Sequence, residues 1–79
     1  MKINNTPAYN LFREDTLGNE YHLRVIEGDE DNVKATAERA VVVLEALGKW
    51  PKDHTPVLRG YNNPKDAFYL DENLIWVEI

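Results

Sequence analysis

The stretch GDEDNVKATAERAVVVLEALGKW, residues 28–50, decides the fold, because its apolar residues recur at steps of three and four. Steps of this size place side chains on one face of an α-helix. The predicted apolar face consists of Val33, Ala37, Ala40, Val41, Leu44 and Leu47. Charged residues fill most of the other positions, which is typical of a helix with one side in water. We therefore expect one helix that buries a single stripe against another layer.

Both ends of this helix carry residue types that begin and end helices. Asp29 or Asp31 can accept hydrogen bonds from the free N–H groups of the first turn. Gly48 stands where a residue in the left-handed conformation commonly follows the last turn. A spacing of four residues also predicts an ion pair between Lys34 and Glu38. The helix is thus expected to run between the Asp29–Asp31 region and Gly48.

The segments on either side of the helix have the pattern of β-strands. Leu23 and Val25 alternate with His22 and Arg24, the period of two expected of a sheet with one wet face. Turn residues separate the strands, and Asn73 is expected to take the left-handed conformation in the last turn. The predicted strands are residues 9–12, 21–26, 57–59, 68–70 and 74–79.

The order of these elements is β-β-α-β-β-β, which predicts an α+β fold. We expect an antiparallel sheet of four to five strands with one helix packed across a face. Residues 1–79 are expected to form a single small α+β domain, in which residues 1–7 are a loose N-terminal lead-in. A chain of this size buries only about 60–65% of its unfolded surface, so it has little room for an internal pocket.

The charge of the chain restricts its partners. Fourteen acidic and nine basic residues give a net charge of −5. This disfavours DNA, RNA and anionic membranes, because a nucleic-acid binder needs clustered basic residues to displace counterions. The charge fits a protein partner with a basic surface. The alternative is that the charge only keeps a small protein soluble.

The absence of cysteine excludes disulfides, thiolate metal sites and cysteine nucleophiles. Small secreted folds usually need such cross-links, so we expect a reducing, cytoplasmic location. The first ten residues, MKINNTPAYN, contain no apolar run of a signal peptide. The longest apolar run, residues 40–44, is far too short to cross a bilayer.

No residue pattern indicates catalysis or a metal site. His22 and His54 are far apart in the sequence, and the chain has no serine nucleophile to accompany the Asp53–His54 pair. Acids at positions 27, 29 and 31 alternate as in a calcium loop, but the twelve-residue frame is missing. Acids are also favoured at a helix N-terminus. We therefore predict no enzymatic activity, no catalytic residue, no metal and no cofactor.

Binding candidates come from the acidic stretch before the helix and from two loops. The loop RGYNNPKD, residues 59–66, has turn chemistry, and Tyr61 within it can also anchor a partner. Trp50 is expected either to cover the helix end or to stand exposed as an anchor. The partner-binding candidates are Glu27, Asp29, Glu30, Asp31, Trp50, Tyr61 and Asn62.

These observations favour a small acidic protein–protein interaction module. We expect an inhibitor that binds a basic, nucleic-acid-processing protein, without direct contact to nucleic acid or to a membrane. In size and charge the chain is similar to phage anti-defence proteins, immunity proteins and antitoxins. The alternative is an oligomeric small-molecule-binding or sequestering protein, a homo-oligomer with a pocket between subunits. Its polar contacts would be His22, Arg24, Arg59 and Tyr61.

Overall fold

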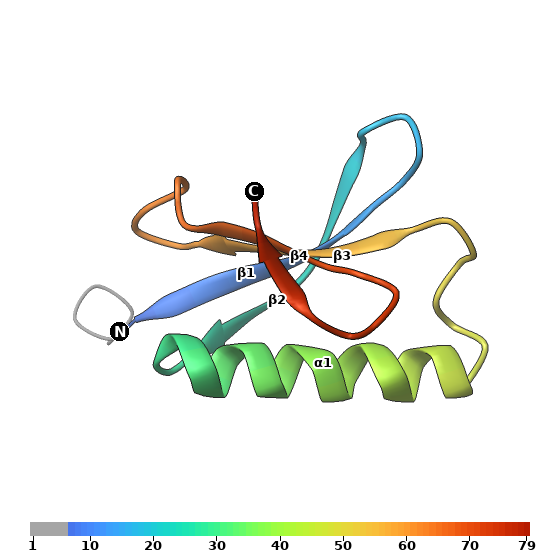
Figure 1. Cartoon of the computed structure of the whole chain (residues 1–79), viewed down its shortest axis with the longest axis horizontal. Helices are drawn as coiled ribbons and strands as arrows, with labels where there is room; N and C mark the ends of the chain where they lie inside the picture. Colours follow the sequence, from blue (N-terminus) through green and yellow to red (C-terminus); the bar gives the residue numbers. More distant parts are fainter. Residues whose placement is uncertain (1–6) are drawn as a thin grey trace.

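The computed structural model describes residues 7–79 and confirms the order β-β-α-β-β-β (Figure 1). The elements are β1 (Ala8–Glu14), β2 (Glu20–Glu27), α1 (Glu30–Ala46), β3 (Thr55–Gly60), β4 (Ala67–Leu70) and β5 (Trp76–Glu78). All five strands belong to one antiparallel sheet in the order β2-β1-β3-β4-β5. The predicted α+β fold with one helix across a face is therefore confirmed. Apart from Pro7, the predicted lead-in lies outside the described residues.

The core forms where one stripe of α1 meets one face of the sheet. Val33, Ala37 and Val41 are buried on the helix side. The sheet side of this core consists of Tyr9, Leu11, Ile26, Leu58 and Phe68. Trp76 packs against the cluster and donates its indole N–H to the carbonyl oxygen of Lys34 at 3.1 Å, which ties β5 to the helix.

Leu47 was predicted to belong to the buried stripe, and this was wrong. It is 62% exposed because α1 ends at Ala46 and Leu47 is its C-cap. Gly48 follows with φ 69°. The N–H of Gly48 donates to the carbonyl of Glu45, and the N–H of Lys49 donates to the carbonyl of Leu44. This pair of bonds is a Schellman motif, so the predicted left-handed residue at Gly48 is confirmed.

The N-terminal end of α1 resolves the choice between two predicted caps. The carboxylate of Asp29 accepts the backbone N–H of Asn32 at 2.9 Å, so Asp29 is the N-cap. Lys34 pairs with Glu30 at 3.0 Å, and not with Glu38 as its spacing predicted. A glutamate four residues before a lysine is the better orientation on a helix, which accounts for the difference.

The turn between β4 and β5 is longer than predicted. The carboxylate of Asp71 accepts the N–H groups of Asn73 and Ile75, both at 2.9 Å, so the turn extends to Ile75. Leu74, and not Asn73, takes the left-handed conformation, with φ 61°. The last strand consequently begins at Trp76 and not at residue 74.

A single helix cannot cover a sheet of five strands. A helix with its side chains is about 10–12 Å wide, whereas five strands spaced about 4.8 Å apart span roughly 20 Å between the outermost axes. The helix side of the sheet therefore has a groove on each flank of α1. One groove, of 580 Å³, lies between α1 and the segments around β3 and β4, and the other, of 570 Å³, lies between α1 and β2.

The core account predicts the effect of shortening Leu58, whose side chain is 0% exposed at the centre of the sheet. We expect Leu58→Ala to lower the free energy of unfolding by about 2–5 kcal/mol, because it removes buried methyl groups and leaves a cavity. Urea unfolding followed by circular dichroism measures this. The control is Leu17→Ala in the β1–β2 turn, where the side chain is 86% exposed and the expected change is below about 0.5 kcal/mol. Equal effects of the two substitutions would contradict the assignment of the core.

Candidate protein-binding surface

Six of the seven predicted contact residues meet at one end of the molecule. Glu27, the last residue of β2, pairs with Ala8 of β1, and the carbonyl of Ala8 accepts the N–H of Tyr61 at 2.8 Å. Glu27 and Tyr61 therefore lie on opposite sides of the same β1 residue. Gly28 donates to the carbonyl of Pro7 at 2.9 Å, which holds the start of the acidic stretch against β1. The loop after β3, which lies at this end, contains Tyr61 and Asn62 (Figure 1).

Tyr9 shows that carboxylates from two segments converge at this end. Burial raises the pKa of Tyr9 above its ordinary value, and the negative charges of Glu30 and Asp66 raise it further. Asp66 belongs to the same surface, because its carbonyl accepts the N–H of Gly60 at 2.7 Å and it lines a hollow together with Tyr61 and Asn62. The sequence analysis did not select it. We name this surface the acidic end; it comprises Glu27, Asp29, Glu30, Asp31, Tyr61, Asn62 and Asp66, all of them exposed.

The carboxylates of the acidic end differ in how far they are already engaged. Asp29 caps the helix, and Glu30 shares Lys34, whose ammonium group also lies 3.9 Å from the centre of the Phe68 ring. Within residues 7–79, Glu27, Asp31 and Asp66 take part in no ion pair. These three carboxylates are therefore the ones most available to a cationic partner.

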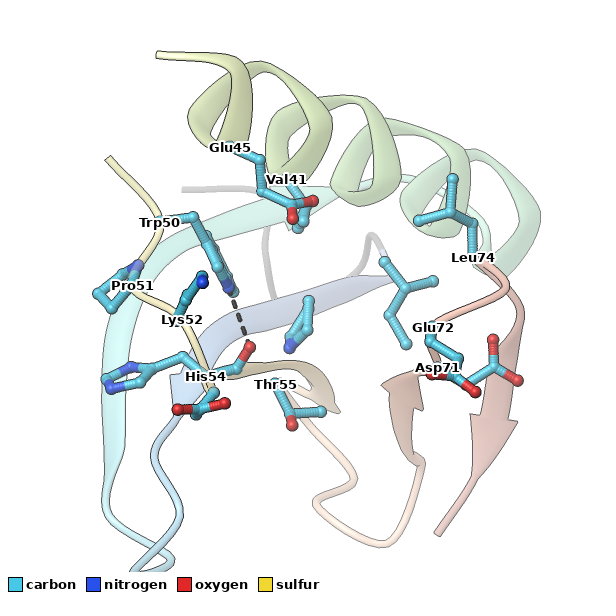
Figure 2. Close-up of a pocket in the computed structure, with 13 residues that line it drawn as sticks. Val41, Glu45, Trp50, Pro51, Lys52, His54, Thr55, Asp71, Glu72 and Leu74 are labelled. Carbon is cyan, nitrogen blue, oxygen red and sulfur yellow. Dashed lines mark hydrogen bonds between the residues drawn. The ribbon is translucent and has the colours of Figure 1, made fainter. Parts of the chain in front are cut away.

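Trp50, the seventh candidate, lies at the opposite end of α1 and does not join the others. It is half-buried, and its indole N–H donates to the carbonyl of His54 at 3.0 Å (Figure 2). Its ring forms one wall of the larger groove, which we name the Trp50 groove and define by Val41 and Glu45 of α1, residues 50–56, and residues 70–72 and 74.

The Trp50 groove combines an apolar floor with an acidic rim. Val41 and Leu70 are buried at its base, and Figure 2 shows Trp50 and Leu74 on opposite sides of it. The carboxylates that line it are Glu45, Asp53, Asp71 and Glu72. Sequence reasoning missed this groove because residues 70–74 meet the end of α1 and the loop of residues 50–56 only in the folded chain, and no local pattern signals this contact.

Both non-glycine residues with positive φ among the described residues line the Trp50 groove. They are Asp53, at φ 66°, and Leu74, at φ 61°. Such conformations cost about 1–3 kcal/mol and persist where the surrounding structure fixes them, often at binding sites. The strain at Leu74 is the more informative, because leucine lacks the local hydrogen bonding that lets aspartate adopt this conformation.

Each histidine is held by its neighbours. His54 Nδ1 lies 3.0 Å from an Arg13 guanidinium nitrogen, and its ring stacks on Tyr21 with 6.0 Å between centroids. His22 Nε2 lies 2.9 Å from the amide oxygen of Asn10. Among residues 7–79, no group of three or more His, Asp or Glu side chains is placed to hold a metal ion.

The four residues considered for a small-molecule site do not converge within one chain. Arg59 pairs with Asn10, next to the buried Leu58–Leu11 pair, so strand alternation directs its side chain away from α1. There it makes three hydrogen bonds with Glu20, the shortest of 2.6 Å, and these bonds raise the pKa of Arg59. Arg24 lines the groove beside α1, and Tyr61 is at the acidic end.

Comparison with known proteins finds no matching family model, no matching curated protein and no matching solved structure. In the part of the chain that the structure describes, no helix has the length and apolarity needed to cross a membrane.

The strained backbone at Leu74 can be tested with two substitutions that both remove its side chain. We expect Leu74→Gly to be more stable than Leu74→Ala by about 1 kcal/mol, because only glycine adopts φ 61° without a steric penalty. Urea unfolding of the two variants measures the difference. If the alanine variant is as stable as the glycine variant, or more so, Leu74 does not hold this conformation in solution.

Proposed function

We propose that this protein is a small acidic interaction module that binds and inhibits a protein with a basic surface, and that the acidic end is its docking face. One observation supports this most strongly: Glu27 pairs with Ala8, and the carbonyl of Ala8 accepts the N–H of Tyr61, so the two residues flank the same residue of β1. Glu27 takes part in no ion pair within residues 7–79, and Tyr61 is exposed. Charge and an aromatic anchor are the two features that a docking face for a cationic protein needs.

The acidic end would act in two stages. Its carboxylates and the net charge of −5 produce a negative field that attracts a basic partner and speeds encounter. After contact, Glu27 and Asp31 accept hydrogen bonds from lysine or arginine side chains, and Tyr61, 44% exposed, packs against the partner. Asp29 continues to cap the helix in the complex.

Nucleic-acid-processing proteins are the partner class that this chemistry fits best. Such proteins present clustered lysine and arginine to phosphate groups. An acidic protein that binds the same cluster excludes the nucleic acid and thereby inhibits the enzyme. This mode of action is that of phage anti-defence proteins, immunity proteins and antitoxins, and it requires binding in the cytoplasm without catalysis by the inhibitor.

The first test is competition with DNA. The protein is titrated into complexes of fluorescently labelled DNA with a panel of basic nucleases and DNA-binding proteins at physiological salt. We expect it to displace DNA from at least one of them, and less effectively as salt rises, because screening weakens the attraction. The proposal loses its basis if the protein binds no member of the panel more tightly than it binds a neutral control protein.

The second test assigns the docking face. We expect Glu27→Gln/Glu30→Gln/Asp31→Asn to weaken binding about tenfold, since three surface charge pairs worth roughly 0.5 kcal/mol each sum to about 1.5 kcal/mol. Asp29 is kept because it caps α1. The control with the same loss of charge is Glu14→Gln/Glu38→Gln/Glu45→Gln, away from the acidic end. Isothermal titration calorimetry that finds both variants equally impaired would place the docking face elsewhere.

A further inference from the structure

The groove between α1 and β2 has the opposite charge to the acidic end. We name it the Arg24 groove; its lining residues are Leu11, Leu23, Arg24, Thr36, Arg39, Ala40, Val43 and Leu44. Apolar side chains from the helix and the sheet form its floor, and Leu23 and Val43 remain exposed. The charged residues in this lining are Arg24 and Arg39, one on each side of the groove.

A β-bulge produces this arrangement. Arg24 pairs with Leu11 and His22 pairs with Phe12, so Leu23 is an extra residue of β2 without a partner on β1. In a regular strand, neighbouring side chains point to opposite faces. A bulge changes the direction of one of these side chains, and both Leu23 and Arg24 line the same groove. The bulge therefore places an apolar and a basic side chain next to each other in the groove.

Two of the described basic residues have carboxylate partners, and the two arginines of the groove are not among them. Arg59 is paired with Glu20 and Lys34 with Glu30. Within residues 7–79, Arg24 takes part in no ion pair, and Arg39 makes only a 3.4 Å hydrogen bond to the Thr36 hydroxyl. Guanidinium groups beside apolar surface are complementary to a ligand that carries both carboxylates and apolar side chains.

The strand beside this groove is also open for pairing. In the described chain β2 pairs with β1 alone, and its eight residues form one edge of the sheet, whereas the other edge strand, β5, has three residues (Figure 1). An edge of this length presents unpaired N–H and C=O groups that can take an additional strand. Alternate side chains of an added strand would point toward the helix side and reach the groove.

We propose that β2 and the Arg24 groove bind an extended acidic segment of a partner protein by strand addition. Carboxylates of the segment pair with Arg24 and Arg39, and its apolar side chains cover Leu23 and Val43. The Arg24 groove shares no residue with the acidic end and carries the opposite charge, so this proposal stands or falls independently of the proposed function. A symmetric pair of β2 strands from two copies is disfavoured, because it would bring Arg24 and Arg39 of both copies together.

Selection from a displayed library of random twelve-residue peptides tests this, with the full-length protein as target. We expect enriched peptides to carry glutamate or aspartate together with apolar residues at alternating positions. Synthetic copies of these peptides should slow amide hydrogen exchange in residues 20–27. Arg24→Glu/Arg39→Glu should weaken their binding at least about tenfold, because two attractive charge pairs become repulsive. Lys49→Glu/Lys65→Glu, with the same change in net charge, should bind as the original protein does.

A second variant, Val43→Asp, tests the apolar wall without removing an arginine, and it should weaken binding as well. The proposal is overturned if no peptide is enriched, if the enriched peptides lack acidic residues, or if the arginine and lysine variants bind equally. It is also overturned if sedimentation shows a dimer of the original protein that Arg24→Glu/Arg39→Glu abolishes. That result would assign the groove to a second copy of the chain.

Discussion

The packing of one helical stripe on one face of a five-stranded sheet is the interaction on which the rest of the structure depends. Val33, Ala37 and Val41 occupy successive turns of α1 and are buried against the sheet. Small domains are marginally stable, so the loss of this contact cannot be offset elsewhere. The same contact sets a limit, since the helix covers only part of the sheet and a groove remains on each side of it.

This limit gives a small domain three different surfaces. The acidic end lies where the N-terminus of α1 meets β1 and the loop after β3, and it is already negative because a helix N-terminus favours acids. The Trp50 groove on one flank is also rimmed by carboxylates, while the Arg24 groove on the other is rimmed by arginines. A chain with a net charge of −5 therefore presents surfaces of both signs, which is how a module could attract a basic protein at one place and an acidic segment at another.

Most features that depend on neighbouring residues were predictable from the sequence, whereas features that depend on register were not. The helical period, the cap at Asp29 or Asp31, the stop at Gly48 and the order of elements all follow from residues within a few positions of one another. The acidic stretch was found for the same reason. Its proximity to Tyr61 required the registers of two strand pairs through Ala8, and the basic groove required the bulge at Leu23. No local pattern encodes either.

Two features that are set by near neighbours also differ from the prediction, namely the backbone at Leu74 and the exposure of Leu47. Asparagine tolerates the left-handed conformation better than leucine, so Asn73 was the reasonable expectation. The two hydrogen bonds accepted by Asp71 move that conformation to Leu74, and they lengthen the turn that borders the Trp50 groove. Leu47 has helical spacing, but it is the cap of α1, so periodicity extends the buried stripe beyond the end of the helix. Ala40 and Leu44, on the same predicted face, are half-buried.

Amide hydrogen exchange tests most directly the central claim that the acidic end binds a basic protein. It is measured for the free protein and for its complex with a basic protein captured from the native host. The account predicts that exchange slows in residues 27–31 and 61–62, where the carboxylates and Tyr61 would meet the partner. Slowing confined to β3 and β4, or to the β1–β2 turn, would show that the partner docks on another surface and would contradict the account.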